Sequence, residues 1–230
     1  ELESALLAGE ADLAVHSGKD IPMSLAPEFK LLGFMPREVP TDALVSNHFN
    51  SLAELPAGAV VGSSSLRRQA QVLAKHPHLK VEPLRGNLDT RLGKLDRGEY
   101  HAIVLATAGL KRLGLESRIR ANISPEDMLP AVGQGALGLE VLSGRTDMDF
   151  LVDALVDPVC TQLVSAERGV SQALGGSCQV PLAGYATLLD SQTMRLRAMV
   201  ASSDGTRMLT AEKTGPLKAN MELAQAVVAD

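Results

Sequence analysis

Apolar positions in the first two thirds of the chain switch repeatedly between strand-like runs and a helical period. "AVVGSSSLRRQAQVLAKHP" (59–77) predicts a strand, a turn and a helix, and "HAIVLATAGLKRLG" (101–114) predicts a strand that runs into a helix. Between them, "LKVEPLRG" predicts a strand and "NLDTRLGKLDRGEY" a capped helix. Because such alternation is typical of a parallel sheet covered by helices, we expect a mostly parallel α/β unit over about 41–129.

Further strands are predicted on either side of this unit, at "ADLAVHS" (11–17), "KLLGFMP" (30–36) and "LPAVGQGALGLEVL" (129–142). The first and last residues of the chain both read as parts of amphipathic helices. We therefore expect the chain to be a piece of a longer protein, shortened at both ends.

The pattern changes after residue 158. "VCTQLVSAERGVSQAL" is helical and is followed by Gly175 and Gly176 in the position of a C-terminal cap. Three strands joined by turn-like residues come next, "VPLAGYATLL", "TMRLRAMVAS" and "TRMLTAEKT", and a helix follows them. Tight turns between neighbouring strands predict a small α+β unit with a three-stranded antiparallel sheet.

Composition excludes several classes of protein. Of the 230 residues, 45% are hydrophobic and 21% charged, as in ordinary soluble globular proteins. The longest apolar run, "AIVLATAGL", is about half of the ~20 residues that span a bilayer. Two cysteines argue against a disulfide framework, and scattered histidines without HExxH or CxxC motifs argue against a metal site.

Positive charge is concentrated in residues 67–120, which hold 12 Lys and Arg against 5 Asp and Glu, although the whole chain has a net charge of −5. This excess favours an anionic ligand held in a cleft, while solvated helix faces remain the simpler explanation for any single arginine. A nucleic-acid partner fits less well, because Tyr100 is the only aromatic residue of this segment and the chain has no Trp.

The stretch "VVGSSSLRRQ" predicts an anion site. Ser63, Ser64 and Ser65 stand where a strand turns into a helix, so hydroxyls and free N–H groups would face a ligand there. Arg67 and Arg68 follow directly, and planar guanidinium groups suit carboxylates. An ordinary serine cap with surface arginines is the alternative.

Three more arginines follow predicted strands. Arg85 ends a strand, Arg91 falls in the first turn of the next helix, and Arg112 follows "AIVLATAG". In open parallel sheets ligands bind beyond the carboxyl ends of the strands. Arginines that converge there would repel one another unless a polyanion neutralised them.

Polar residues elsewhere are less specific. Lys19 and Asp20 follow the strand at 11–17; a carboxylate at a cleft edge can act as acid or base or stabilise a cation, but a Lys-Asp pair is usually a surface turn. "GQGALG" (133–138) matches G-x-G-x-x-G, yet a strand follows it instead of a helix, so we interpret it as a crossover with Gln134 as a polar contact. Cys178 in "LGGSCQVP" could be a core thiol, a nucleophile or an anchor.

Together, six stretches resemble the porphobilinogen deaminase (hydroxymethylbilane synthase) family. They occur in the family's order and cover nearly the whole chain, and the ordered set is specific although each member is weak alone. These stretches are "HSGKDIP", "GSSSLRRQAQ", "LRGNLDTRLGKLD", "ATAGLKRLG", "LPAVGQGALGLE" and "GGSCQVPLAGYA".

The resemblance implies a role for each matching residue. Cys178 would carry a dipyrromethane cofactor through a thioether, and four porphobilinogen molecules would be added to it before linear hydroxymethylbilane is released by hydrolysis. Asp20 would be the catalytic carboxylate that assists loss of ammonia and stabilises the resulting cation. Cys160 has no family role and is expected to be a core thiol. The implied cofactor contacts are Lys19, Ser65, Arg67, Arg68, Arg85, Arg91 and Gln134, and the implied substrate contacts are Arg85, Arg91 and Arg112.

The implied architecture has two α/β domains of the periplasmic-binding-protein type, with mixed or parallel sheets, around a cleft, and a small α+β domain. Domain 1 would comprise residues 1–36 and 136–153, domain 2 residues 41–129, and domain 3 residues 158–230. The chain departs from the family pattern in lacking its N-terminal segment and in having Gly18, Val39 and Thr41. The resemblance also implies a cytoplasmic monomer without nucleic-acid or membrane partners.

Two rival functions stay open on the sequence alone. A two-lobed module that binds a small anion reversibly would need neither Asp20 nor an anchoring cysteine. An inactive fragment or paralogue of the same fold is the other alternative.

Overall fold

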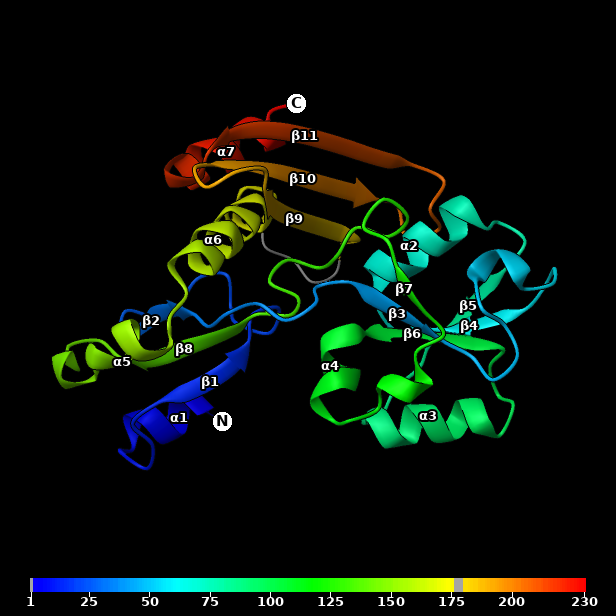
Figure 1. Cartoon of the computed structure of the whole chain (residues 1–230), viewed down its shortest axis with the longest axis horizontal. Coiled ribbons are helices and arrows are strands. Elements are labelled where there is room, and N and C mark those ends of the chain that lie inside the picture. The colour runs from blue at the N-terminus through cyan, green and yellow to red at the C-terminus, as the bar shows by residue number, and fades with distance from the viewer. Residues whose placement is uncertain (1, 176–179) are drawn as a thin grey trace.

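The computed structural model describes residues 2–175 and 180–230, so Cys178 and Gly176 lie outside the described residues. It contains three separate sheets, which lie at the lower left, the right and the top of Figure 1. The expected architecture of two α/β units around a cleft and a small α+β unit is confirmed. Among the helices of the described chain, none combines the length and the apolar character that a bilayer-spanning segment requires.

The first sheet has the order β1-β8-β2. It consists of β1 (Ala14–Ser17), β8 (Leu137–Leu142) and β2 (Phe29–Phe34), and both pairings are antiparallel. Two short helices accompany it, α1 (Leu2–Leu7) and α5 (Phe150–Leu155). On this sheet His16 Nε2 lies 2.5 Å from the buried Glu140 Oε2, so the pair joins β1 to β8.

The second sheet has five strands in the order β5-β4-β6-β3-β7. β4 is parallel to β5 and β6, whereas β3 is antiparallel to β6 and β7, so the sheet is mixed where the sequence predicted a mostly parallel one. The difference arises from β3 alone, the strand through which the chain enters this unit; β7 is antiparallel to β3 and so runs in the direction of β4, β5 and β6. The strands are β3 (Asp42–Val45), β4 (Val60–Gly62), β5 (Lys80–Glu82), β6 (Ala102–Ala106) and β7 (Ala121–Ile123).

Helices cover both faces of the second sheet. Leu44, Val61 and Val104 pack with Val72 of α2 on one face. Ile103 and Leu105 pack on the other face in a cluster that includes residues of α3 and α4. The helices are α2 (Leu66–Lys75), α3 (Leu88–Asp96) and α4 (Thr107–Arg112).

The third unit matches the sequence prediction. A long helix, α6 (Pro158–Ala173), precedes β9 (Leu182–Leu188), β10 (Thr193–Ala201) and β11 (Met208–Pro216), and α7 (Asn220–Val228) follows them. The order is β11-β10-β9, with antiparallel pairs. One face of this sheet packs on α6 and α7, and the other packs Met199 and Ala183 against Ala70 of α2.

Two segments of chain, residues 35–41 and 124–136, cross between the first and second sheets and can be followed in Figure 1. The second crossing passes very close to the turn after β1. A Cβ added to Gly133, whose φ is +70°, would lie 2.7 Å from the carbonyl carbon of Gly18, and one added to Gly18 would lie 2.8 Å from Gly133 O. Glycine at both positions therefore permits this approach.

Candidate active site

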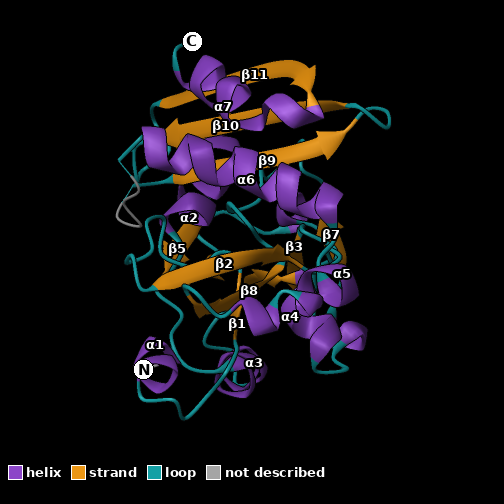
Figure 2. Cartoon of the chain, turned by 90° about the vertical axis from the view of Figure 1, so that its left-hand side faces the viewer, coloured by secondary structure: helices purple, strands orange, loops and turns teal. Residues whose placement is uncertain are grey.

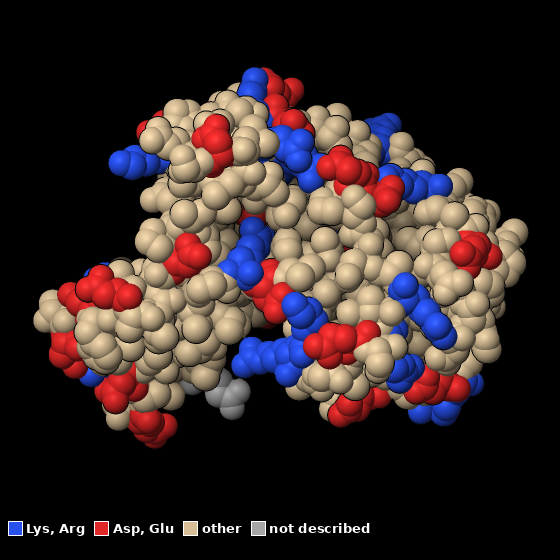
Figure 3. Space-filling model, in the orientation of Figure 1, with Lys and Arg blue, Asp and Glu red and all other residues tan. Residues whose placement is uncertain are grey.

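Two chambers open between the domains, and they share one wall. The first chamber has a volume of about 550 Å³ and is lined by residues of the turn after β1, the start of α2 and the second crossing. The second chamber, of about 750 Å³, reaches α4 and the first crossing. Lys19, Asp20 and Gln134 line both. Charged side chains of both signs lie in the hollow between the lobes in Figure 3.

Asp20 is held in a tight turn at this shared wall. Its backbone N–H donates to Ser17 O at 2.8 Å, and the N–H of Gly18 donates to Ala136 O at 2.8 Å. The next side chain, Ile21, is fully buried. Asp20 and Lys19 are themselves exposed, so the carboxylate faces both chambers. Partial desolvation lowers the pKa of Lys19 and outweighs the opposing attraction of Asp20.

The three serines shape the start of α2. Ser65 is the N-cap, and its hydroxyl accepts a hydrogen bond from the N–H of Arg68. The Ser63 hydroxyl accepts from the N–H of Ser65, and the Ser64 hydroxyl donates to Leu84 O. The strand–turn–helix geometry predicted for this stretch is therefore present, with its serines used largely to fix the loop.

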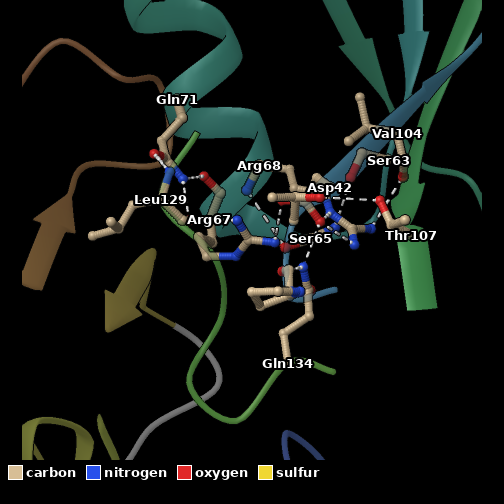
Figure 4. A network of polar contacts seen from close by, with 12 residues as sticks. Asp42, Ser63, Ser65, Arg67, Arg68, Gln71, Val104, Thr107, Leu129 and Gln134 are labelled. Atoms are coloured by element: carbon tan, nitrogen blue, oxygen red, sulfur yellow. Dashed lines mark hydrogen bonds and ion pairs between the residues drawn. The ribbon is translucent and has the colours of Figure 1, made fainter. Parts of the chain in front are cut away.

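Asp42, the first residue of β3, holds both arginines of this stretch (Figure 4). Arg67 Nη2 lies 2.8 Å from Asp42 Oδ2, and Arg68 donates to Asp42 Oδ1 from Nη2 at 2.8 Å and from Nε at 3.0 Å. Gln134 Nε2 donates to the same oxygen at 3.0 Å. Burial alone would raise the pKa of Asp42, but the two guanidinium groups hold it below its usual value.

The same guanidinium groups also donate to the backbone. Arg67 Nη1 donates to Leu129 O at 2.6 Å, and Arg68 Nη1 donates to Val104 O at 3.0 Å. Arg67 Nε is buried and has no partner within the described residues. One carboxylate therefore faces two cations, which leaves a positive excess and one free donor beside the first chamber.

The remaining predicted arginines are spread more widely. Arg112 lines the second chamber, whereas neither Arg85 nor Arg91 lines either chamber in the described part of the chain. Arg91 donates from Nε to Gly86 O at 2.8 Å, and its pKa is lowered by desolvation and by the charge of Arg68. The structure thus brings together Lys19, Asp20, Ser65, Arg67, Arg68 and Gln134, places Arg112 in the adjoining chamber, and leaves Arg85 at the periphery.

Sequence reasoning missed a junction of the three units at Glu167 of α6. This fully buried carboxylate accepts from Arg37 of the first crossing at 2.6 Å, from the N–H of Gly133 in the second crossing at 2.7 Å, and from the N–H of Ala186 in β9 at 2.9 Å. Arg37 also lies over the Tyr185 ring, 5.4 Å from its centroid. The sequence signal is weak, because Glu167 stands beside Arg168 in a helical stretch that also carries Thr, Gln and Ser.

The first crossing also borders the second chamber. Glu38 accepts from Lys111 of α4 at 2.6 Å, and Thr41 lies 3.3 Å from Thr107 between their hydroxyl oxygens. Lys111 is therefore neutralised locally, which leaves Arg112 as the less constrained of the two α4 cations in this chamber.

Comparison with known proteins decides the family. The model of the porphobilinogen deaminase "dipyromethane cofactor binding domain" matches residues 1–149, and that of the porphobilinogen deaminase "C-terminal domain" matches residues 161–230. The chain belongs to the porphobilinogen deaminase family. The resemblance inferred from the six stretches is thereby confirmed, and the match gives no support to a reversible anion-binding module.

Curated relatives named porphobilinogen deaminase are similar over nearly the whole chain. The protein of Bordetella parapertussis is 59% identical over 216 residues, which is 94% of this chain and 68% of the relative. That of Paraburkholderia phytofirmans is 60% identical over 216 residues, 94% of this chain and 63% of the relative. The chain thus spans about two thirds of the length of the curated relatives it matches.

A solved structure, the periplasmic aliphatic sulphonate binding protein of Escherichia coli, is 15% identical with a TM-score of 0.45, and the match covers 77% of this chain and 58% of that one. That likeness is too low to add to the fold described above.

The residues of the first chamber fit the cofactor of this family. A dipyrromethane whose rings each bring two carboxylates, as porphobilinogen does, is a polyanion with an apolar frame. The chamber offers the ammonium of Lys19, the excess charge and the buried free Nε of Arg67, and apolar side chains such as Val132 and Leu182. No group of three or more potential metal ligands occurs within the residues that the structure describes.

Proposed function

We propose that the protein is a hydroxymethylbilane synthase, which joins four porphobilinogen molecules head to tail on a dipyrromethane bound to Cys178 and releases linear hydroxymethylbilane. The observation that carries the proposal is the position of Asp20. Its exposed carboxylate stands at the wall shared by two chambers that hold cations suited to carboxylates.

We assign the first chamber to the cofactor. Lys19, Ser65, Arg67, Arg68 and Gln134 lie there or against it. Val180, two positions along the chain from the proposed anchor Cys178, also lines this chamber. When bound, the dipyrromethane supplies the primer pyrrole that receives the next ring.

We assign the second chamber to incoming porphobilinogen, with Arg112 as the contact to a substrate carboxylate. Arg85 and Arg91 remain proposed contacts to cofactor and substrate; they would serve a chain that has grown beyond the two chambers. Arg85, exposed in the loop before α3, and Arg91, half-buried in the first turn of α3, are accessible enough to do so.

Asp20 would act on the reacting atoms from between the chambers. As ammonia leaves the substrate, positive charge develops on the substrate's methylene and ring, and a fixed carboxylate stabilises it. Asp20 would then accept a hydrogen bond from the pyrrole N–H and hold the proton that is lost when the new bond forms.

The test of this role is Asp20→Asn in the protein expressed from its natural gene, with Asp153→Asn on the exposed face of α5 as the matched control. We expect Asp20→Asn to retain the covalent cofactor and to lose about 10²–10³-fold in porphobilinogen consumption. Asp153→Asn should match the wild type. Turnover of Asp20→Asn at the wild-type rate would refute the assignment.

We further propose that domain 1 comprises residues 1–36 and 136–153, domain 2 residues 41–129 and domain 3 residues 158–230. Three separate sheets and two crossings support this division. We also propose that the protein works as a monomer in the cytoplasm. A molecular mass by light scattering that corresponds to more than one chain would contradict the monomer.

A further inference from the structure

The inner face of α6 carries a buried cation that has no acidic partner among the described residues. Arg168 is only 8% exposed, and within the described residues its guanidinium donates to backbone carbonyls alone. Nη2 donates to Pro22 O at 2.6 Å and to Met23 O at 3.4 Å, and Nη1 donates to Ile21 O at 3.2 Å. Burial lowers the pKa of this arginine, although the group stays charged.

Gln172, one helical turn further along α6, adds a fourth bond to the same segment. Its Nε2 donates to Met23 O at 2.6 Å. Figure 2 shows α6 lying between the sheet of β9, β10 and β11 and the sheet that contains β2, and α6 contacts both β2 and β9. Helix α6 of the third unit is therefore hydrogen-bonded to the loop at residues 21–23 of the first unit.

The carbonyls that Arg168 satisfies begin at the residue directly after Asp20. The Asp20 N–H is fixed by Ser17 O, and the Ile21 side chain is fixed in a cluster with Phe34 and Cys160. Arg168 fixes the peptide groups that follow. Residues 19–23 form one continuous wall of the first chamber, so any shift of these carbonyls moves the carboxylate.

A neutral side chain could satisfy one of these carbonyls, as Gln172 does. Three consecutive carbonyls need a donor with several N–H groups in a fixed plane, and the guanidinium fork provides that. The stem of Arg168 is packed in the buried face of α6, so the helix holds the guanidinium group in place. The guanidinium group in turn restrains the loop at residues 21–23.

We propose that Arg168 is a positioning residue, which fixes the Asp20 carboxylate at the wall between the chambers from the helix of the third domain. This inference rests on the proposed function. It adds that the placement of the reacting carboxylate depends on α6, and not on the first domain alone.

The test compares Arg168→Met, Arg168→Lys and Gln172→Leu with the wild type, all expressed from the natural gene. Arg207→Met is the matched control, because Arg207 is an exposed arginine of the same domain. For each protein we would measure kcat and KM for porphobilinogen, the fraction with covalent cofactor by intact mass, and the midpoint of thermal unfolding.

We expect Arg168→Met to lower kcat per cofactor-loaded molecule by about 10-fold or more, because small displacements of a reacting group are costly, while KM changes less than about threefold. Arg168→Lys should recover part of kcat, since an ammonium still reaches a carbonyl. Gln172→Leu should lower kcat by a smaller factor without moving the unfolding midpoint. Arg207→Met should match the wild type.

A kcat per loaded molecule of Arg168→Met equal to that of Arg207→Met would overturn the inference. If Arg168→Met fails to fold, Arg168→Lys and Gln172→Leu provide the test. A wild-type kcat in both variants would overturn the inference. An inactive, folded wild-type protein would instead refute the proposed function, so the two failures are distinguishable.

Discussion

Asp42 determines how the two arginines of the first chamber are held. It is fully buried at the start of β3 and contacts Arg67, Arg68 and Gln134, which come from two other elements. One negative charge between two cations satisfies much of their hydrogen-bonding capacity and still leaves a positive excess. The carboxylate thus keeps both arginines folded inward while the site remains attractive to an anion.

Removal of this charge should destabilise the fold. We expect Asp42→Asn to lower the free energy of unfolding by about 3–5 kcal/mol at pH 7, because two buried guanidinium groups lose their counterion. The folded pKa of Asp42 lies below its unfolded value of about 3.9, so the contribution is complete above that pH and is lost as the pH falls through the folded pKa.

Urea unfolding of the variant and the wild type at pH 7 and near pH 3 measures this difference. The gap in the free energy of unfolding should narrow at the lower pH, and the exposed variant Asp153→Asn should show no comparable gap. A gap that is absent at pH 7, or equal at both values, would contradict this account of Asp42.

Cys160 should behave as an inert core thiol. Burial raises its pKa to about 11, and its side chain packs with Phe34 and Val164. At pH 8 almost none of it is thiolate, so iodoacetamide should leave Cys160 of the native protein unmodified and label it after unfolding. Peptide mass mapping checks this, and rapid labelling of the native protein would show the site to be open.

At the scale of single residues, the sequence located the arginines and not their partner. Residues 63–68 indicate an anion site because their serines and arginines are neighbours along the chain. Asp42 resembles any acid at the start of an element, and only the packing of β3 against α2 reveals its partners. Glu167 was missed for the same reason, because its three donors come from distant segments.

The turn between β10 and β11 contacts α2, the helix that carries Arg67 and Arg68, and so connects the third unit to the second. Gln69 of α2 donates to Ser203 O in this turn at 3.1 Å. Gly205, with φ +72°, brings its backbone so near to α2 that an added Cβ would lie 2.4 Å from Ala70 O. The position of α2 therefore depends on this contact.

Substitution of Gly205 should separate the effect of the contact from the effect of backbone conformation. Gly58 has a similar φ of +78° with nothing within 4 Å of an added Cβ, so Gly58→Ala reports the conformational cost alone, about 1–2 kcal/mol. Gly205→Ala should cost clearly more, because the new methyl group meets the backbone of α2. Denaturant unfolding of both variants measures this, and equal losses would show that the contact is not tight.

At the scale of elements, most helices and strands were predictable because their period, caps and glycine stops are local. The orientation of strands was less so. The βαβ alternation correctly indicated that β4, β5 and β6 are parallel, while β3, where the chain enters the unit, is antiparallel to its neighbours β6 and β7. A long-range crossing leaves no periodic signature in the strand that follows it.

At the scale of the molecule, the basic excess of residues 67–120 has two origins. Part of it lies in the chambers, as at Arg67, Arg68 and Arg112. Another part belongs to exposed ion pairs such as Arg97 with Glu99 and Arg118 with Asp96, which fit the simpler reading of solvated faces. Net charge therefore pointed to the right segment without identifying which arginines face the cleft.

The central claim is that Cys178 anchors a polyanionic primer beside Asp20, and the intact mass of the folded protein expressed from its natural gene tests it most directly. The comparison needs Cys178→Ser and, as the matched control, Cys160→Ser. The account predicts a mass increase equal to one dipyrromethane in the wild type and in Cys160→Ser, and none in Cys178→Ser. A folded wild type without the increase, or an increase that survives in Cys178→Ser, would contradict it.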